Sequence, residues 1–117
     1  MEYSPTTLYL KDLQERLAIL DMPVVFKLPK DDFPEPFILI GGGTGTTIDY
    51  QFGGWVETQT TLIDIFLPPN SRTQAEEIRS KAVRALGRQV VSHQLLLDTS
   101  LGREVYDIKI RVTKLLT

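Results

Sequence analysis

The sequence predicts an α+β fold in which a mixed or antiparallel sheet carries two helices on one side, in the order α-β-β-β-α-β-β. Two amphipathic segments begin with residues that cap helices, and the runs around them have the apolar or alternating patterns of strands. The closing run from Glu104 to Thr113 alternates almost without error. Runs that are adjacent in the chain mostly pair with one another, which favours antiparallel ladders.

The composition is that of an ordinary globular protein and excludes several functions. The 117 residues suit one domain over residues 1–117, and 42% hydrophobic with 24% charged residues argue against global disorder. With a net charge of −2 and scattered Lys and Arg, we expect no direct nucleic-acid binding. The absence of cysteine excludes disulfides, thiolate nucleophiles and Cys-type zinc sites. We expect no membrane association, because the sequence shows neither a long apolar window nor a signal-peptide pattern.

The first helix is predicted from Ser4 to about Asp21. Ser4 can cap the first amides, and proline at the first helical position gives up only a donor that has no partner there. A stripe with helical spacing then predicts the face that packs on the sheet: Leu10, Leu13, Leu17 and Leu20.

Two short strands follow, separated by a proline-rich connection. Pro23 ends the helix, and Val24 to Leu28 is rich in β-branched and aromatic residues. The prolines between residues 29 and 36 forbid regular ladder pairing. Phe37 to Ile40 is apolar on both faces, which indicates a covered strand.

The glycine-rich segment Gly41–Gly45 lacks the lysine of a phosphate loop and leads into Ile48–Phe52, another strand, instead of opening a helix. We therefore interpret Gly41–Gly54 as a projecting, glycine-hinged hairpin arm. Ordering so many glycines costs backbone entropy, so we expect the arm to be mobile until a partner holds it.

The long strand from Trp55 to Leu67 is polar on both faces in its first half and mostly apolar in its second half. This pattern predicts one leg of the projecting hairpin entering a covered sheet. Asp64 lies among apolar neighbours. We expect it to face solvent or to pair with a cation, because the sequence places no second acid or base near it for catalysis.

The second helix begins at Ser71, which has the spacing of a capping box with Gln74, and ends at Gly87. A further strand covers Val90 to Leu97, and its lone His93 is expected to be a surface or partly buried side chain, not a metal ligand or base. The buried face of the helix is predicted from five residues: Ala75, Ile78, Ala82, Ala85 and Leu86.

The residues from Asp98 to Gly102 predict a hairpin turn into the closing strand. In that strand we expect Tyr106, Ile108, Ile110 and Val112 in the core, and Asp107, Lys109, Arg111 and Thr113 facing solvent.

Four segments together resemble one known family. They are the entry helix, the connection from Leu28 through Phe33-Pro-Glu-Pro-Phe-Ile-Leu-Ile-Gly41, the strand ending Leu62-Ile-Asp-Ile-Phe66 and the helix through Ala75-Glu-Glu-Ile78. The family is that of the small tail-completion proteins of long-tailed bacteriophages, called tail terminators or head-to-tail joining proteins. The resemblance covers roughly residues 4–113 and lies in the order of segments and the proline-bounded pattern.

This resemblance implies a structural virion protein that forms a hexameric ring, caps the tail tube and docks it to the capsid connector. The implied partners are further copies of the chain, the tail tube protein and a head-completion or connector protein. The implied location is the virion, and the host cytoplasm during assembly. The residues agree, because they offer mixed charge, a projecting arm and no complete catalytic constellation, so we expect no enzyme, cofactor or metal.

The candidate interface for a neighbouring subunit or partner is the arm with the polar start of the long strand. Two alternatives stay open: a small enzyme or a ligand- or anion-binding domain that uses Gly41–Gly45 with Asp49, Tyr50 and Asp64, and a monomeric adaptor module. The residues predicted to form the interface are Gly43, Thr44, Thr46, Tyr50, Phe52, Trp55, Glu57 and Gln59.

Overall fold

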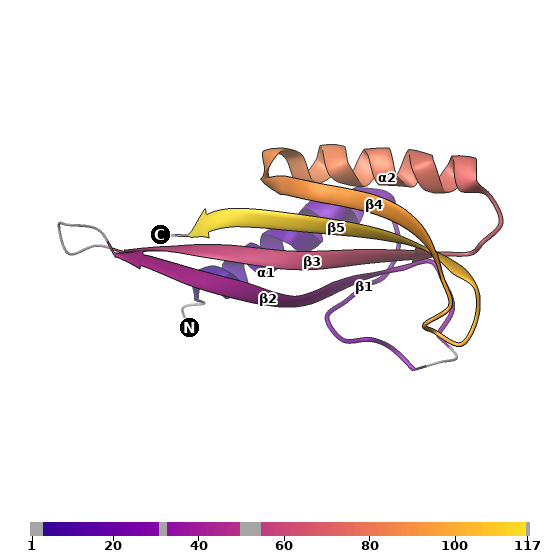
Figure 1. The fold of residues 1–117 in the computed structure, drawn as a ribbon, viewed down its shortest axis with the longest axis horizontal. Helices are drawn as coiled ribbons and strands as arrows, with labels where there is room; N and C mark the ends of the chain where they lie inside the picture. The colour runs from indigo at the N-terminus through magenta and orange to yellow at the C-terminus, as the bar shows by residue number, and fades with distance from the viewer. Residues whose placement is uncertain (1–3, 31–32, 50–54, 117) are drawn as a thin grey trace.

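The computed structural model describes residues 4–30, 33–49 and 55–116 and contains one five-stranded mixed sheet with two helices (Figure 1). The strand order is β1-β2-β3-β5-β4, with β1 parallel to β2 and every other pairing antiparallel. The predicted fold class and element order are confirmed. The elements are α1 (Pro5–Leu17), the 3-10 turn η1 (Ala18–Leu20), β1 (Val24–Val25), β2 (Phe37–Asp49), β3 (Trp55–Leu67), α2 (Arg72–Leu86), the 3-10 turn η2 (Gly87–Gln89), β4 (Val90–Asp98) and β5 (Val105–Leu116).

Both helices begin at the capping serines that the sequence predicts, and α2 ends at the predicted Gly87. Helix α1 ends at Leu17, before the predicted end near Asp21. The Ser4 hydroxyl accepts the Thr7 amide at 3.1 Å, and the Ser71 hydroxyl accepts the Gln74 amide at 3.1 Å. Helix α2 ends at Gly87, whose φ of 73° is costly for residues with a Cβ. The segment after α1 tightens into η1 before the chain turns at Asp21.

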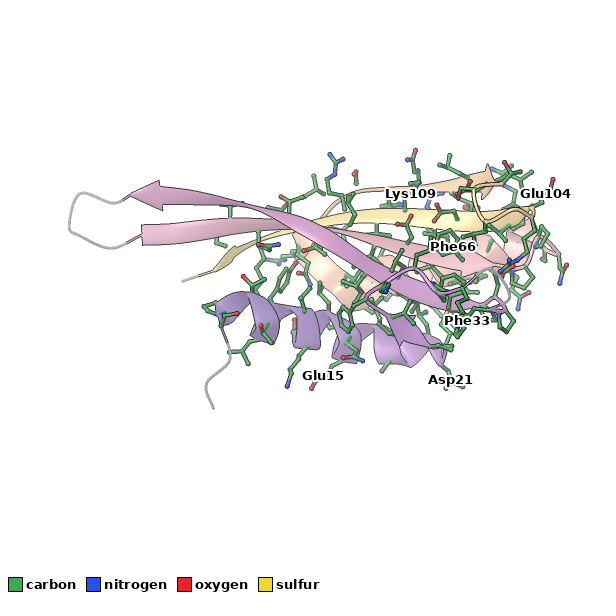
Figure 2. All side chains as sticks on the ribbon, turned by 90° about the horizontal axis from the view of Figure 1, so that it is seen from below. Glu15, Asp21, Phe33, Phe66, Glu104 and Lys109 are labelled. Atoms are coloured by element: carbon green, nitrogen blue, oxygen red, sulfur yellow. The ribbon has the colours of Figure 1, made fainter. Side chains whose placement is uncertain are left out.

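The main core lies between the two helices and one face of the sheet, which we call the helix face (Figure 2). From β3 and β5 this face receives alternate residues, because successive side chains of a strand point to opposite sides. The buried residues of this core are Tyr9, Leu13, Leu17, Ile38, Ile40, Ile63, Ile65, Leu67, Ala75, Ala82, Leu86, Ile108, Ile110 and Val112.

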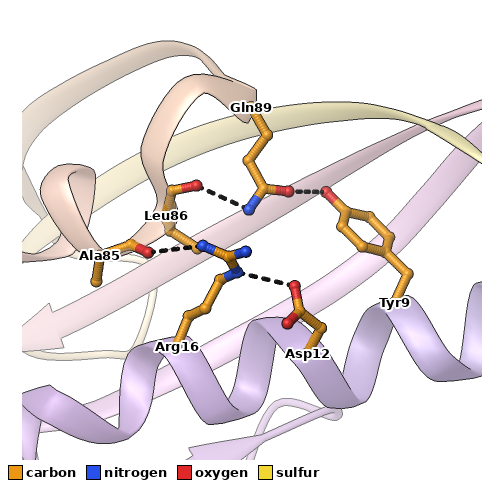
Figure 3. A network of polar contacts seen from close by, with 6 residues as sticks. All are labelled: Tyr9, Asp12, Arg16, Ala85, Leu86 and Gln89. Carbon is orange, nitrogen blue, oxygen red and sulfur yellow. Dashed lines mark hydrogen bonds and ion pairs between the residues drawn. The ribbon is translucent and has the colours of Figure 1, made fainter.

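A polar network joins α1 to the end of α2 (Figure 3). The Tyr9 hydroxyl donates to Gln89 Oε1 at 2.7 Å, and Gln89 Nε2 donates to the Leu86 carbonyl at 2.8 Å. Arg16 donates to the Ala85 carbonyl at 3.3 Å. Burial, together with the nearby Asp12 carboxylate, raises the pKa of Tyr9 to about 12, so its hydroxyl stays protonated as the donor that Gln89 requires.

Two predicted strand boundaries are wrong. The first strand is only Val24–Val25, because β2 offers it a parallel partner only at Ile38 and Leu39. The second strand does not end at Ile40 but continues through Gly41–Gly45 as part of β2, which pairs with β3 and shifts register between Ile40 and Gly43. Glycine in a strand often marks such a bulge. The glycines therefore lengthen the hairpin instead of interrupting it, and the rest of the predicted arm, residues 50–54, lies outside the described residues.

A second, smaller cluster forms on the opposite face of the sheet at the end where β1 lies. Phe37, Phe66 and Val105 are buried there under the proline-rich connection. Arg103 fixes that connection, since its guanidinium pairs with Glu35 and donates to the Phe33 carbonyl at 2.7 Å. The hydrogen bonds from Arg103 hold the pKa of Glu35 below its ordinary value.

The core assignment predicts a large cost for shortening a buried side chain of α1. Leu13 is fully buried, so Leu13→Ala should lower the free energy of unfolding by about 2–5 kcal/mol. Leu8 lies on the same helix with 54% of its surface exposed, and Leu8→Ala should change stability by about 0.5 kcal/mol or less. Urea denaturation of both variants checks the prediction. Equal losses would contradict this placement of α1.

Candidate functional site

The face of the sheet opposite the helices is only partly covered, and we call it the open face. Figure 2 shows Lys109 on this side, away from α1. A depression of about 280 Å³ runs across β3, β5 and β4. Leu62 and Leu96 on this face are 47% and 39% exposed. The residues that line this depression and that the strand pairing assigns to the open face are Leu62, Asp64, Ser92, Gln94, Lys109 and Arg111.

Three charged side chains form a cluster on the open face. Asp64 lies opposite Lys109 in the β3–β5 ladder, and Asp107 lies two residues before Lys109. The Lys109 ammonium is 3.0 Å from Asp64 Oδ1 and 3.0 Å from Asp107 Oδ2. The expectation that Asp64 pairs with a cation is therefore confirmed.

Asp107 was expected to face solvent, and this expectation is wrong. Its side chain is fully buried, because it lies between Phe66 and Leu96 on the neighbouring strands. Neither carboxylate oxygen has a hydrogen-bond partner of normal geometry among the described residues, although Lys109 lies at ion-pair distance. Burial and the adjacent Asp64 carboxylate raise the pKa of Asp107 to about 7, and Lys109 opposes this shift.

Lys109 holds the two carboxylates together. Partial burial alone would lower the pKa of Lys109, but Asp64 and Asp107 outweigh that effect and hold it above its ordinary value. Two carboxylates and one ammonium leave a net negative charge when all three are ionised, and this charge adds to the larger effect of burial in favouring a proton on Asp107. No sequence pattern links Asp107 and Lys109 to Asp64, because only the β3–β5 register brings these three residues together.

The second feature is the hairpin formed by β2 and β3, whose paired ends extend beyond both helices (Figure 1). The ladder continues from Gly43 opposite Thr61 to Asp49 opposite Trp55. The molecule measures 54 × 27 × 23 Å. Its radius of gyration is 15.6 Å, against about 13 Å for a compact chain of this length.

The structure places the predicted interface residues at different points of this hairpin. Gln59 is 6% exposed and lies on the helix face, so its side chain contributes almost nothing to the surface of the hairpin. Tyr50 and Phe52 lie outside the described residues. The others occupy ladder positions in β2 and β3: Gly43, Thr44, Thr46, Trp55 and Glu57.

The residues considered for the ligand-binding alternative do not come together. Gly41–Gly45 lies within β2 and does not precede a helix, so its amides do not form the anion cradle of a helix N-terminus. Asp49 lies at the far end of β2, whereas Asp64 pairs with Lys109. His93 is an exposed side chain, as expected, and its Nδ1 accepts from Arg79 Nε at 2.8 Å.

Two further observations apply to the described residues alone. No group of three or more His, Cys, Asp or Glu side chains is arranged to hold a metal ion in residues 4–30, 33–49 and 55–116. Within the same ranges, no helix has the length and apolarity required to cross a lipid bilayer.

Comparison with known proteins gives a likeness at the level of the fold. No protein-family model matches the sequence, and no curated protein matches it. Among solved structures, a chain described as "Virion of native gene transfer agent (GTA) particle" is similar to this one, with a TM-score of 0.54 and 14% sequence identity. The match covers 87% of this chain and 92% of that chain, so the two share nearly the whole fold.

The buried Asp107 predicts a specific pH dependence. Its pKa in the folded state, about 7, exceeds its ordinary value of 3.8, so the folded state binds more protons than the unfolded chain between these values. This contribution to stability is complete below pH 3.8 and is lost as the pH rises through 7. Compared with Asp107→Asn, the parent protein should therefore gain up to a few kcal/mol of stability as the pH falls from about 7 to about 4.

Urea denaturation of the parent and of Asp107→Asn at several pH values measures this difference. Asp21→Asn is the matched control, because Asp21 is exposed and has a φ of 53°, a conformation that asparagine tolerates. A constant difference between the parent and Asp107→Asn across this range would contradict the raised pKa.

Proposed function

We propose that this chain is a structural protein of a phage-like virion, with no catalytic role. The observation that carries the proposal is the similarity of nearly the whole fold to a chain from the virion of a gene transfer agent particle. The elongated sheet also supports it, because a hairpin that extends past its own core offers surface for a neighbouring subunit.

In its more specific form, the proposal assigns the 117 residues, as one domain, to a ring that ends the tail tube and joins it to the head connector. This form rests on the resemblance to tail terminators stated from the sequence, and a hexamer is the expected ring. A monomeric adaptor would have the same fold but would not associate, so the state of assembly separates the two functions.

Ring formation should depend on the hairpin, whereas folding should not. Gly45 lies opposite Gln59, so residues 46–58 can be replaced by Asn-Gly, a pair that favours a tight hairpin turn. The buried residues of both clusters lie outside the deleted range, so the variant should fold. The parent protein at high concentration should form rings that cap tail tubes, and the shortened variant should form none.

Circular dichroism and thermal melting report the fold, while sedimentation and electron microscopy report rings. Ile19→Ser is the matched control, because Ile19 is 69% exposed on η1, outside the hairpin, and its replacement should leave both properties unchanged. A parent protein that stays monomeric at every concentration and does not bind tail tubes would argue against the proposed function.

A further inference from the structure

The sheet has an unpaired edge on each side. On one side, β1 pairs with β2 only at Ile38 and Leu39, so the edge of β2 that faces away from β3 has no strand partner from Ile40 to Asp49 among the described residues. On the other side, β4 pairs only with β5 over the described part of the chain. Edge strands present backbone N–H and C=O groups that can pair with another chain.

Each edge strand has a register shift near one end of the stretch considered, between Ile40 and Gly43 in β2 and between Val90 and Ser92 in β4, and α2 lies alongside β4 (Figure 1). Other devices that prevent pairing are few. Neither residues 40–49 nor residues 90–98 contain a lysine or a proline. Arg79 donates to the His93 carbonyl at 3.4 Å, which occupies one acceptor of β4. Strand β4 exposes apolar side chains that a neighbour could cover, since Val91 is 62% exposed and Leu97 is 57% exposed.

The directions of the strands make the two edges compatible. Three successive antiparallel pairings separate β2 from β4, so these strands run in opposite directions. A second copy placed beside the first with its strands in the same directions would bring its β4 against the first copy's β2 in antiparallel orientation. Antiparallel pairs are slightly more stable per residue than parallel pairs.

We propose that neighbouring copies of this chain join edge to edge, with residues 40–49 of β2 in one copy forming an antiparallel ladder with β4 of the next. This inference rests on the proposed ring and names its interface. The contact is heterologous, so its repetition forms a ring when the rotation between neighbouring copies closes and an open filament when it does not. Pairing of β2 with another β2 would instead stop at a dimer and leave Val91 and Leu97 exposed.

The internal registers also set how far neighbours shift along the strands. Gly45 lies near the middle of the free part of β2 and pairs with Gln59 of β3. Gln94 lies at the middle of β4 and pairs with Lys109 of β5, which itself pairs with Asp64 of β3. If the middle of β2 in one copy is aligned with the middle of β4 in the next, each copy is displaced along the strands by about five residues, or roughly 17 Å, relative to its neighbour. A constant shift of this kind tilts the strands against the ring axis, as in closed barrels.

Disulfide cross-linking tests the ladder, because the chain contains no cysteine of its own. Residues directly opposite in an antiparallel pair have Cα atoms about 4.5–5.5 Å apart, within the range of a disulfide. Thr46→Cys is combined with Ser92→Cys in one variant and with Gln94→Cys in a second. Alignment of the strand middles places Thr46 between these two positions of β4, so the pair of variants covers the expected register. Under mild oxidation, one of the two variants should give a series of disulfide-linked oligomers, the largest of which is the complete ring.

The controls separate the alternatives. Glu15→Cys with Ser92→Cys places the first cysteine on the exposed face of α1, and its cross-linking should be at least tenfold lower. Thr46→Cys alone reports pairing of β2 with β2. Amide exchange supplies a second measurement without mutation, since the amides of residues 40–49 should exchange more slowly in rings than in dissociated subunits.

The outcomes distinguish this inference from the proposed function. Rings without cross-linking above the control in either double variant, and without slower exchange in residues 40–49, would overturn the edge-to-edge ladder but leave the ring. Efficient dimers from Thr46→Cys alone would overturn it in favour of β2 pairing with β2. If the parent forms no rings at all, the proposed function and this inference fail together.

Discussion

The packing of both helices on one face of the sheet is the constraint on which the rest of the structure depends. Leu13 and Leu17 of α1 and Ala82 of α2 share one core with the inward residues of β3 and β5. The small alanines of α2 and the hydrogen bonds from Tyr9 and Arg16 hold the helices side by side over that face. Because both helices pack there, the opposite face is covered only in part, by the proline-rich connection, and is otherwise open to solvent.

The open face is consequently where charge and burial conflict. The second cluster needs Phe66 buried beside β5, and this packing also covers the adjacent Asp107. A buried carboxylate without hydrogen bonds destabilises the folded state unless it is protonated or paired. Lys109 and the raised pKa of Asp107 are the two responses that the structure provides, and together they couple this face to pH near neutrality.

The same one-sided packing leaves the sheet extended at its edges. Helices cover a face but do not pair with strand edges, and β1 is too short to protect β2 beyond Leu39. Open edges of this kind are templates for pairing with another chain. The proposed ring occupies them, because it pairs each free β2 with a free β4 and lets the hairpin reach the neighbour.

The local chemistry of the chain determined most of the elements. Ser4, Ser71 and Gly87 marked helix ends because capping depends on a few adjacent atoms. The alternation of Ile108, Ile110 and Val112 predicted the helix face of β5 because strand periodicity is a property of the backbone. Local patterns failed at Gly41–Gly45, where the low strand propensity of glycine is outweighed by pairing with β3.

Only the tertiary structure decided what the polar residues do. The sequence alone predicted that Asp64 faces solvent or pairs with a cation, but its partner Lys109 lies in another strand and is selected by the β3–β5 register. The burial of Asp107 depends in the same way on its cross-strand neighbours, which no spacing within β5 can specify. The open edges of β2 and β4 likewise follow from strand order, because a sequence contains the strands but not which of them lies outermost.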